Sequence, residues 1–191
     1  MIMERTYKAI TIQTQFYGIY SIVPLRSIDR YKIMKWRNEQ IYHLRQNKLL
    51  TKEDQDEYFV KVIAKEFNQE KPSQILFSFL RENECIGYGG LVHINYKDAN
   101  AEISFLMETS LEEKFFENLW VVYLSLIEKV AFEEMKLHKI FTYAFDIRPH
   151  LYVALLQAGF YKDAQLKEHC SFEQKYIDVI IHSKINKNVS Y

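Results

Sequence analysis

Apolar residues in this chain recur either at every second position, as in strands, or at every third or fourth position, as in helices. The stretch 101–107 alternates and then becomes continuously apolar, which is typical of a strand covered on one face and buried on both sides at its end. From Asn118 to Met135 the apolar spacing predicts about five turns of helix with a broad apolar face. A strand that leads into a helix N-terminus brings free backbone N–H groups and partial positive charge to one point, where an anion can bind.

The same criteria divide the rest of the chain. Pro24 predicts an edge strand, and Ser27 or Asp29 is expected to cap the helix that follows. Thr51 and Asp54 predict the start of a second helix. Strands are predicted at 9–14 (an accessory hairpin or arm), 21–26, 74–80, 85–95, 101–107, 139–145, 162–172 and 176–183, and helices at 29–40, 51–67, 118–135 and 150–157.

Two features of this order bear on the sheet. Gly87, Gly89 and Gly90 predict a bulge or a close backbone approach within strand 85–95. The direction of strand 139–145 relative to strand 101–107 stays open at this stage. A helical crossover favours a parallel pair, whereas a tight return favours an antiparallel pair.

Composition places the chain among ordinary globular proteins. The 191 residues carry a formal net charge of zero and are 48% hydrophobic, which predicts a single domain with a core of normal size. A neutral chain has no basic surface for general nucleic-acid binding, so no nucleic-acid partner is expected. No run of about 20 apolar residues or signal-type segment occurs, so we expect no membrane association and a cytoplasmic location. Cys85 and Cys170 are expected to be buried, reduced thiols, and no metal is expected.

The order of elements, together with several short motifs, resembles the GNAT superfamily of N-acetyltransferases. The resemblance covers about residues 22–185 and is closest to the RimJ/RimL-like branch, in particular to its amino-sugar N-acetyltransferases. It is carried by Lys35-Trp36-Arg37-Asn38, by Ala101-Glu102-Ile103-Ser104-Phe105, by Val130-Ala131-Phe132-Glu133, by Leu155-Leu156-Gln157-Ala158-Gly159-Phe160 and by the closing strand 178–183.

This resemblance implies an α/β (α+β) GNAT fold over residues 21–186, preceded by an N-terminal extension, residues 1–20. The expected sheet is mixed, mostly antiparallel and twisted, with about seven strands and four flanking helices. Within this sheet, strand 101–107, which precedes the long helix, should splay away from strand 139–145. The implied reaction is transfer of an acetyl group from acetyl-CoA, as co-substrate, to a primary amine, by a monomer or a homodimer.

The resemblance also implies a cofactor site. The backbone N–H groups of Leu106 and Met107 would hold the thioester or the pantetheine arm. The pyrophosphate would lie at the start of the long helix, on residues Phe116, Glu117, Asn118 and Leu119, with Arg148 nearby. The glycines that relatives carry in this loop are absent from Phe115–Asn118. We expect either a reshaped loop, with Asn118 as N-cap and Lys114 as counter-ion, or a helix that binds no anion.

For the chemistry, Glu102 is the first candidate for the general base and His93 the second. Each also has a structural alternative. Glu102 could be a carboxylate bonded to Lys or Tyr, and His93 could be a buried histidine with its hydrogen bonds satisfied. The tyrosine that protonates the leaving thiolate in many relatives aligns with Leu155, so Tyr152, one turn earlier, is the candidate acid. His150 is a further possibility in the same space.

Trp36, Arg37 and Asn38 are expected to border the acceptor pocket, with weaker support for Tyr42, His43 and His169. The acceptor is expected to be a small-molecule amine such as a nucleotide-linked amino sugar. The alternatives are a protein N-terminus and a GNAT-fold binding protein that has lost CoA binding.

Overall fold

The computed structural model describes residues 5–187, which form one eight-stranded mixed sheet with helices on both faces. The strands are β1 (Gln15–Tyr17), β2 (Tyr20–Pro24), β3 (Ile75–Arg81), β4 (Glu84–Asn95), β5 (Asn100–Met107), β6 (Lys139–Phe145), β7 (Tyr161–Phe172) and β8 (Lys175–Ile185). The helices are α1 (Arg30–Glu39), α2 (Lys52–Tyr58), α3 (Ala64–Glu66), α4 (Thr109–Glu128) and α5 (Pro149–Gln157). One π-helical turn, Phe59–Ile63, joins α2 to α3, and another, Lys129–Glu134, extends α4.

The strand order is β1-β2-β3-β4-β5-β6-β8-β7. Every neighbouring pair is antiparallel except β5 and β6, which run parallel and are connected through α4. The expected mixed, mostly antiparallel sheet is therefore confirmed, and the direction that the sequence left open is parallel. The sheet has one strand more than the seven expected because Gln15–Tyr17 pairs with β2. The strand expected at 9–14 is wrong, since pairing begins only at Gln15.

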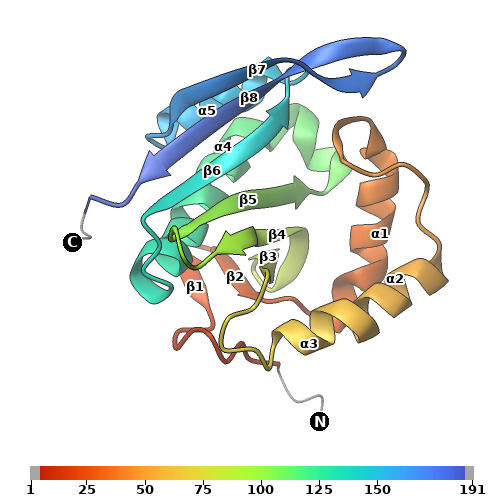
Figure 1. Cartoon of the computed structure of the whole chain (residues 1–191). Coiled ribbons are helices and arrows are strands. Elements are labelled where there is room, and N and C mark those ends of the chain that lie inside the picture. The colour runs from red at the N-terminus through yellow and green to blue at the C-terminus, as the bar shows by residue number, and fades with distance from the viewer. Residues whose placement is uncertain (1–4, 188–191) are drawn as a thin grey trace.

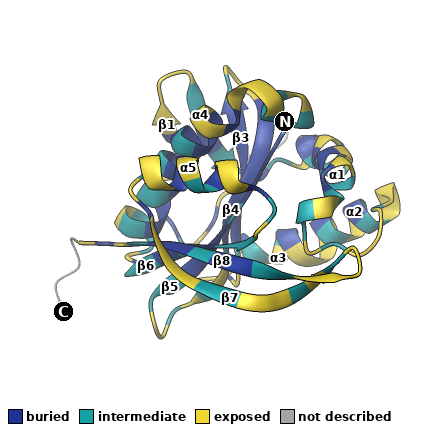
Figure 2. Cartoon of the chain, turned by 90° about the horizontal axis from the view of Figure 1, so that it is seen from above, coloured by how far each residue is buried: buried dark blue, intermediate teal, exposed yellow. Residues whose placement is uncertain are grey.

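Helices α4 and α5 lie behind the sheet in Figure 1, whereas α1, α2 and α3 lie on its other side, at the right and lower right of the view. Seen from above in Figure 2, the most deeply buried positions lie along the central strands between these layers. On the α4 side, the Phe105 ring stacks on Tyr123 at 3.9 Å between centroids and meets Trp120 edge-on. On the opposite side, Arg37 of α1 donates to the Tyr88 hydroxyl of β4. Tyr88 is the cross-strand partner of Leu106. The neighbouring β5 residues Phe105 and Leu106 therefore face different helical layers, as alternation along a strand requires.

The parallel pair β5–β6 is split along most of its length. It is in register only from Asn100 opposite Lys139 to Glu102 opposite Phe141. Both strands then continue, to Met107 and Phe145, without pairing to each other. The expected splay next to the strand that precedes the long helix is confirmed.

Two glycines of β4 allow the central strands to approach closely. A Cβ on Gly89 would lie 2.0 Å from the Ser104 carbonyl oxygen, and one on Gly90 would lie 1.9 Å from the Ile75 carbonyl oxygen. The close backbone approach predicted from these glycines is confirmed. Because the two contacts are on β5 and β3 respectively, the glycines fix β4 between its neighbours.

Two helix starts differ from the prediction. The long helix begins at Thr109 instead of Asn118, with Glu108 as its N-cap and the only residue between it and β5. The segment 109–118 contains no glycine or proline and buries Phe116 against the core, so it continues the helix instead of forming a loop. Asp29, expected as a side-chain cap of α1, instead pairs with Arg26 and accepts from Ser78. Thr51, by contrast, forms the predicted capping box with Asp54.

Candidate active site

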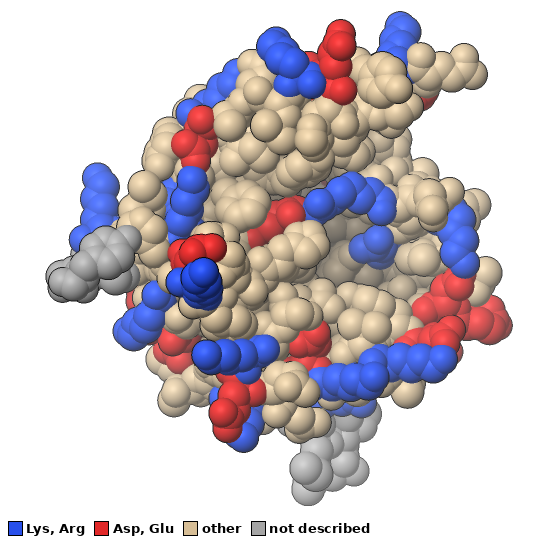
Figure 3. Space-filling model, in the orientation of Figure 1, with Lys and Arg blue, Asp and Glu red and all other residues tan. Residues whose placement is uncertain are grey.

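A cavity of about 120 Å³ lies where β5 and β6 separate. Its walls are residues 43–45 of the segment after α1, residues 102–105 of β5 and residues 142–145 of β6, together with Trp120, Arg148 and Leu151. Because these residues come from both faces of the sheet, the cavity lies in the gap between the two separating strands. In Figure 3 the surface is hollowed at the centre of the visible face, with acidic atoms on the floor of the hollow and cationic side chains beside them.

Glu102 is the last β5 residue that pairs with β6, and its side chain is only 8% exposed. One carboxylate oxygen accepts from Arg45, and the other lies 2.8 Å from His93 Nδ1. The Arg45 guanidinium in turn lies over the Tyr143 ring, 4.7 Å from its centroid. The two base candidates predicted separately from the sequence, Glu102 and His93, are therefore brought into one hydrogen-bonded pair.

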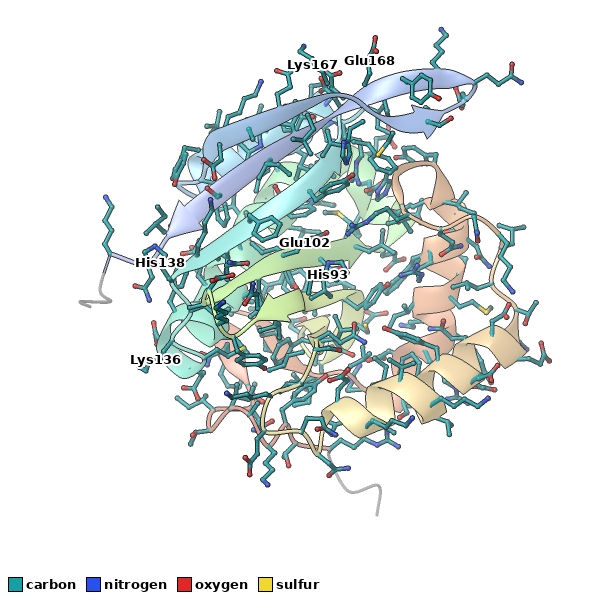
Figure 4. All side chains as sticks on the ribbon, viewed as in Figure 1. His93, Glu102, Lys136, His138, Lys167 and Glu168 are labelled. Carbon is teal, nitrogen blue, oxygen red and sulfur yellow. The ribbon has the colours of Figure 1, made fainter. Side chains whose placement is uncertain are left out.

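A backbone irregularity directs His93 toward Glu102. His93 has a φ of 50°, and the β4–β5 register shifts between Val92 and Asn95. A bulge of this kind interrupts the alternation of side chains and re-aims one of them. Figure 4 shows His93 and Glu102 pointing toward one another from neighbouring strands. The His93 side chain is 65% exposed, so the alternative of a buried histidine is wrong.

Arg148, a predicted cofactor-binding residue, lies in the cavity wall opposite this pair. Its guanidinium donates to Glu112 Oε1 at 2.7 Å, lies 2.8 Å from His43 Nδ1 and covers the Phe116 ring. Burial raises the pKa of Glu112, with Arg148 partly offsetting the rise. Burial, and then the charge of Arg148, lower the pKa of His43 to about 3, so His43 is neutral here. Arg148 thus connects the start of α5 with α4 and with the segment after α1.

The two predicted backbone donors of β5 differ in orientation. The Glu108 N–H donates to the Ile86 carbonyl, and antiparallel bonding alternates every second residue. Leu106, opposite Tyr88, therefore directs its backbone groups toward β4, whereas Met107 directs its own toward the open side. Consistent with this orientation, the Met107 carbonyl accepts from the Gln40 side chain at 2.8 Å.

The residues predicted for a pyrophosphate loop lie within α4. Phe116 and Leu119 are buried in the core, whereas Glu117 and Asn118 are exposed on the helix surface. Asn118 is therefore not an N-cap. The residues 112–118 line a separate groove of about 650 Å³ between α4 and α5, closed by Val121, His150 and Gln157. The true start of the helix, at Thr109, is directly at the end of β5.

The predicted acceptor motif on α1 does not line the cavity. Trp36 is 3% exposed and packs in the core. The Asn38 amide holds both backbone groups of Leu50, which fixes the segment between α1 and α2. Arg37 is bonded to Tyr88 and Gln46. The motif instead holds Gln46 and Leu50, in the segment that follows the cavity residues 43–45.

Tyr152, the predicted acid, also lies outside the cavity wall. Its hydroxyl donates to Asp146 at 2.8 Å, and its ring stacks on His182 at 5.0 Å. Burial and the Asp146 carboxylate raise the pKa of this phenol. His150 contacts the Phe116 ring in the α4–α5 groove.

Sequence reasoning did not find Arg45, Thr142 and Tyr143, which the fold brings to the cavity. Arg45 lies in an irregular segment with no periodic pattern, so no sequence signal identifies it. Thr142 and Tyr143 are neighbours in a strand that was predicted, and a polar residue inside an apolar strand is the signal that could have identified Thr142.

The cavity between two separating parallel strands, with a long helix that begins where the first of them ends, defines the GNAT class of fold. The family model of the acetyltransferase (GNAT) domain matches residues 22–181 of the chain. The chain therefore belongs to the GNAT acetyltransferase family, and the expected enzyme class, an acetyltransferase, is confirmed.

Among solved structures, the spermidine N-acetyltransferase of Vibrio cholerae in complex with CoA and spermine is similar to this chain, with a TM-score of 0.75 and 20% identity over 88% of this chain and 96% of that one. A chimera of that enzyme and hSSAT has a TM-score of 0.73 and 19% identity over the same shares of the two chains. At this identity the likeness concerns the fold. A search of curated proteins gave no significant match.

No helix within residues 5–187 is long and apolar enough to cross a membrane. In the same part of the chain, no group of three or more His, Cys, Asp or Glu side chains is placed to hold a metal ion. Both cysteines are free, but only Cys85 is buried as expected, whereas Cys170 is half-buried. Burial raises the pKa of Cys85 to about 12.

Proposed function

We propose that the protein transfers the acetyl group of acetyl-CoA to a small-molecule primary amine in the cavity between β5 and β6. The observation that carries this proposal is the His93–Glu102 pair at the point where the two strands separate. A thioester held in the slot would place its carbonyl carbon beside a base that already has an oriented partner. Positioning of this kind supplies much of the rate enhancement in acyl transfer.

In this proposal, Glu102 accepts the Nδ1 proton of His93 and leaves Nε2 as the atom that takes a proton from the attacking amine. Arg45 keeps the Glu102 carboxylate in place. General base catalysis by a positioned imidazole contributes roughly 10²- to 10⁴-fold. The Met107 N–H, directed toward the open side of β5, would hold the co-substrate in the slot.

Two polar atoms in the cavity wall support a fit with acetyl-CoA. Within the part of the chain that the structure describes, Arg148 Nε and Thr142 Oγ1 are buried without a hydrogen-bond partner. Buried polar groups are normally paired, so two such atoms in one wall favour a polar ligand there. When bound, acetyl-CoA would supply the activated acetyl group.

The charges of the cavity wall bear on the acceptor. The wall contains two arginines, Arg45 and Arg148, and one carboxylate, Glu102. All three are already paired, Arg45 with Glu102 and Arg148 with the neighbouring Glu112, so the wall offers a polyamine no free carboxylate. A polyamine carries several positive charges and needs several carboxylates to bind. This balance instead favours an amine whose remaining groups are neutral or anionic, which keeps a nucleotide-linked amino sugar as the leading acceptor class.

The test has two stages. Acetyl-CoA should raise the melting temperature of the protein by mass action, and the absence of any shift at millimolar acetyl-CoA would contradict the proposal and favour a binding protein that has lost CoA. Release of free thiol should then be measured with a UDP-linked amino sugar, with spermidine and with a short peptide bearing a free N-terminus. Turnover of the peptide alone would favour the alternative of a protein N-terminal acetyltransferase, whereas preference for spermidine would contradict the charge argument.

A further inference from the structure

Thr142 has an unusual position in β6. It directly follows Phe141, the last residue of β6 that pairs with β5, so it lies at the point where the two strands separate. The residue is 3% exposed and forms part of the cavity wall. Considering the residues from 5 to 187, its hydroxyl has no hydrogen-bond partner. A buried, unpaired hydroxyl in an otherwise regular strand requires an explanation.

Thr142 and Glu102 lie on opposite faces of the sheet. Tyr143 lies under Arg45, which binds Glu102, so Tyr143 and Glu102 share the face of the segment after α1. Thr142, the preceding residue, points to the other face by strand alternation. There its cross-strand neighbour is His182, on which Tyr152 of α5 stacks.

This arrangement separates the two ends of an acyl transfer. An amine that approaches from the Glu102 face reaches the His93–Glu102 pair, and the group that leaves lies toward α5, where Thr142 points. The cavity residues on this face are the apolar Phe105, Trp120 and Leu151, together with the Arg148 guanidinium that covers Phe116 of α4. Negative charge that develops on a leaving atom in such surroundings is strongly stabilised by a single fixed donor.

We propose that the Thr142 hydroxyl donates a hydrogen bond to the thioester sulfur as the C–S bond breaks. In the transfer, the C–N bond to the acetyl carbon forms, one amine proton passes to His93 Nε2, and CoA leaves as a thiolate that takes a proton from solvent. Thr142 keeps its own proton and stabilises the thiolate. This inference rests on the proposed function and assigns the leaving-group side of the same site.

The first experiment measures binding and needs no turnover. Calorimetry compares CoA with desulfo-CoA, which lacks the sulfur, at pH values on both sides of the thiol pKa. For the wild-type protein we expect CoA to bind about tenfold more tightly than desulfo-CoA at the higher pH, because hydrogen bonds to charged groups are the stronger ones. Thr142→Val should remove this preference, and Thr142→Ser, which restores the hydroxyl, should recover it.

Several outcomes would overturn the inference. Equal loss of affinity for both ligands in Thr142→Val would indicate a packing role, and a wild-type protein that does not distinguish CoA from desulfo-CoA would exclude a contact with sulfur. A second measurement follows kcat, which should fall at least about tenfold in Thr142→Val with little change in KM for the acceptor. A different result would contradict the proposed function itself, namely a wild-type protein that neither binds acetyl-CoA nor releases thiol.

Discussion

His93 shows how one residue's backbone conformation can shape a site. A non-glycine residue with positive φ costs free energy and persists where the surrounding structure imposes it. Here it allows a β4 side chain to reach Glu102 Oε2 at 2.8 Å while most of the imidazole stays exposed. Neither residue alone provides an oriented imidazole with an accessible nitrogen, so in the proposed function the two act as a pair.

We therefore expect His93→Gln and Glu102→Gln each to lower kcat by roughly 10²-fold or more, because proton transfer loses its oriented acceptor. The double variant should lose little more than the worse single variant, as residues that act as a unit are not additive. Steady-state kinetics would measure this, with the exposed Lys97→Gln as the control. Strictly additive losses would show that the two residues act independently.

His43 gives a prediction for stability against pH. Its pKa falls from 6.5 to about 3 in the folded protein, so the unfolded state binds more protons at intermediate pH. The stability due to the neutral ring is complete above about pH 6.5 and is lost as the pH falls toward 3, by at most roughly 1.4 kcal/mol per pH unit. Urea unfolding of His43→Gln should therefore depend less on pH in this range than unfolding of the wild-type protein.

The exposed His169→Gln variant controls for removal of an imidazole as such. Identical pH dependence of the unfolding free energy in His43→Gln and wild-type protein would mean that His43 is not desolvated in the way its contacts with Arg148 indicate.

At the scale of elements, two glycines of β4 allow the central strands to pack closely. Gly89 and Gly90 have no side chain, so β3 and β5 approach β4 at distances that a Cβ would not allow. Further along the same pair of strands, Glu102 of β5 lies opposite Val92, where the β4 bulge that carries His93 begins. The strand geometry thus supports the site directly.

Gly90→Ala is expected to lower the free energy of unfolding by about 3 kcal/mol, because the added Cβ would meet the Ile75 carbonyl and the backbone must shift. Chemical denaturation monitored by circular dichroism would measure this loss. Gly18→Asn is the matched control, since Gly18 has a φ of 58° that Asn tolerates and open space around it. A Gly90→Ala variant as stable as the control would contradict the close packing.

At the scale of the whole molecule, the segment before β1 is attached to the acetyltransferase domain through its core. The Tyr7 hydroxyl donates to the Leu76 carbonyl at 2.8 Å and accepts from the Leu76 N–H at 3.0 Å, and its ring stacks on Phe67. Tyr7 is 2% exposed. The N-terminal segment therefore packs on the core between β3 and the end of α3.

Tyr7→Phe should lower the unfolding free energy by roughly 1–3 kcal/mol, because the Leu76 N–H would lose its buried partner. Thermal or urea unfolding would show this change, and acetyl-CoA binding should stay unaffected because Tyr7 is remote from the cavity wall. Tyr17→Phe, at an exposed position, is the control. Equal stabilities of the two variants would mean that the segment contributes little to the fold.

Much of this architecture is predictable because it depends on local patterns. Alternation identified most of the strands, the capping box at Thr51 identified the start of α2, and glycine identified the turn after α5. The helix start at Thr109 was missed because helix propensity and the burial of Phe116 continue the helix through a segment that was expected to be a loop. In relatives of the same family this segment carries glycines, and their absence was the available signal.

By itself, the sequence determined the order of elements from β2 to β8, the fold family and the candidates Glu102 and His93. Only the tertiary structure decided that these two residues bond to each other, that Arg45 and Thr142 join them at the cavity, and that Trp36 and Asn38 support the fold away from it. Periodicity and turn geometry depend on only a few neighbouring residues, so local sequence patterns predict them. The contacts across β4, β5 and β6 depend on register, on a bulge and on where two strands separate, and residues distant in sequence set these together.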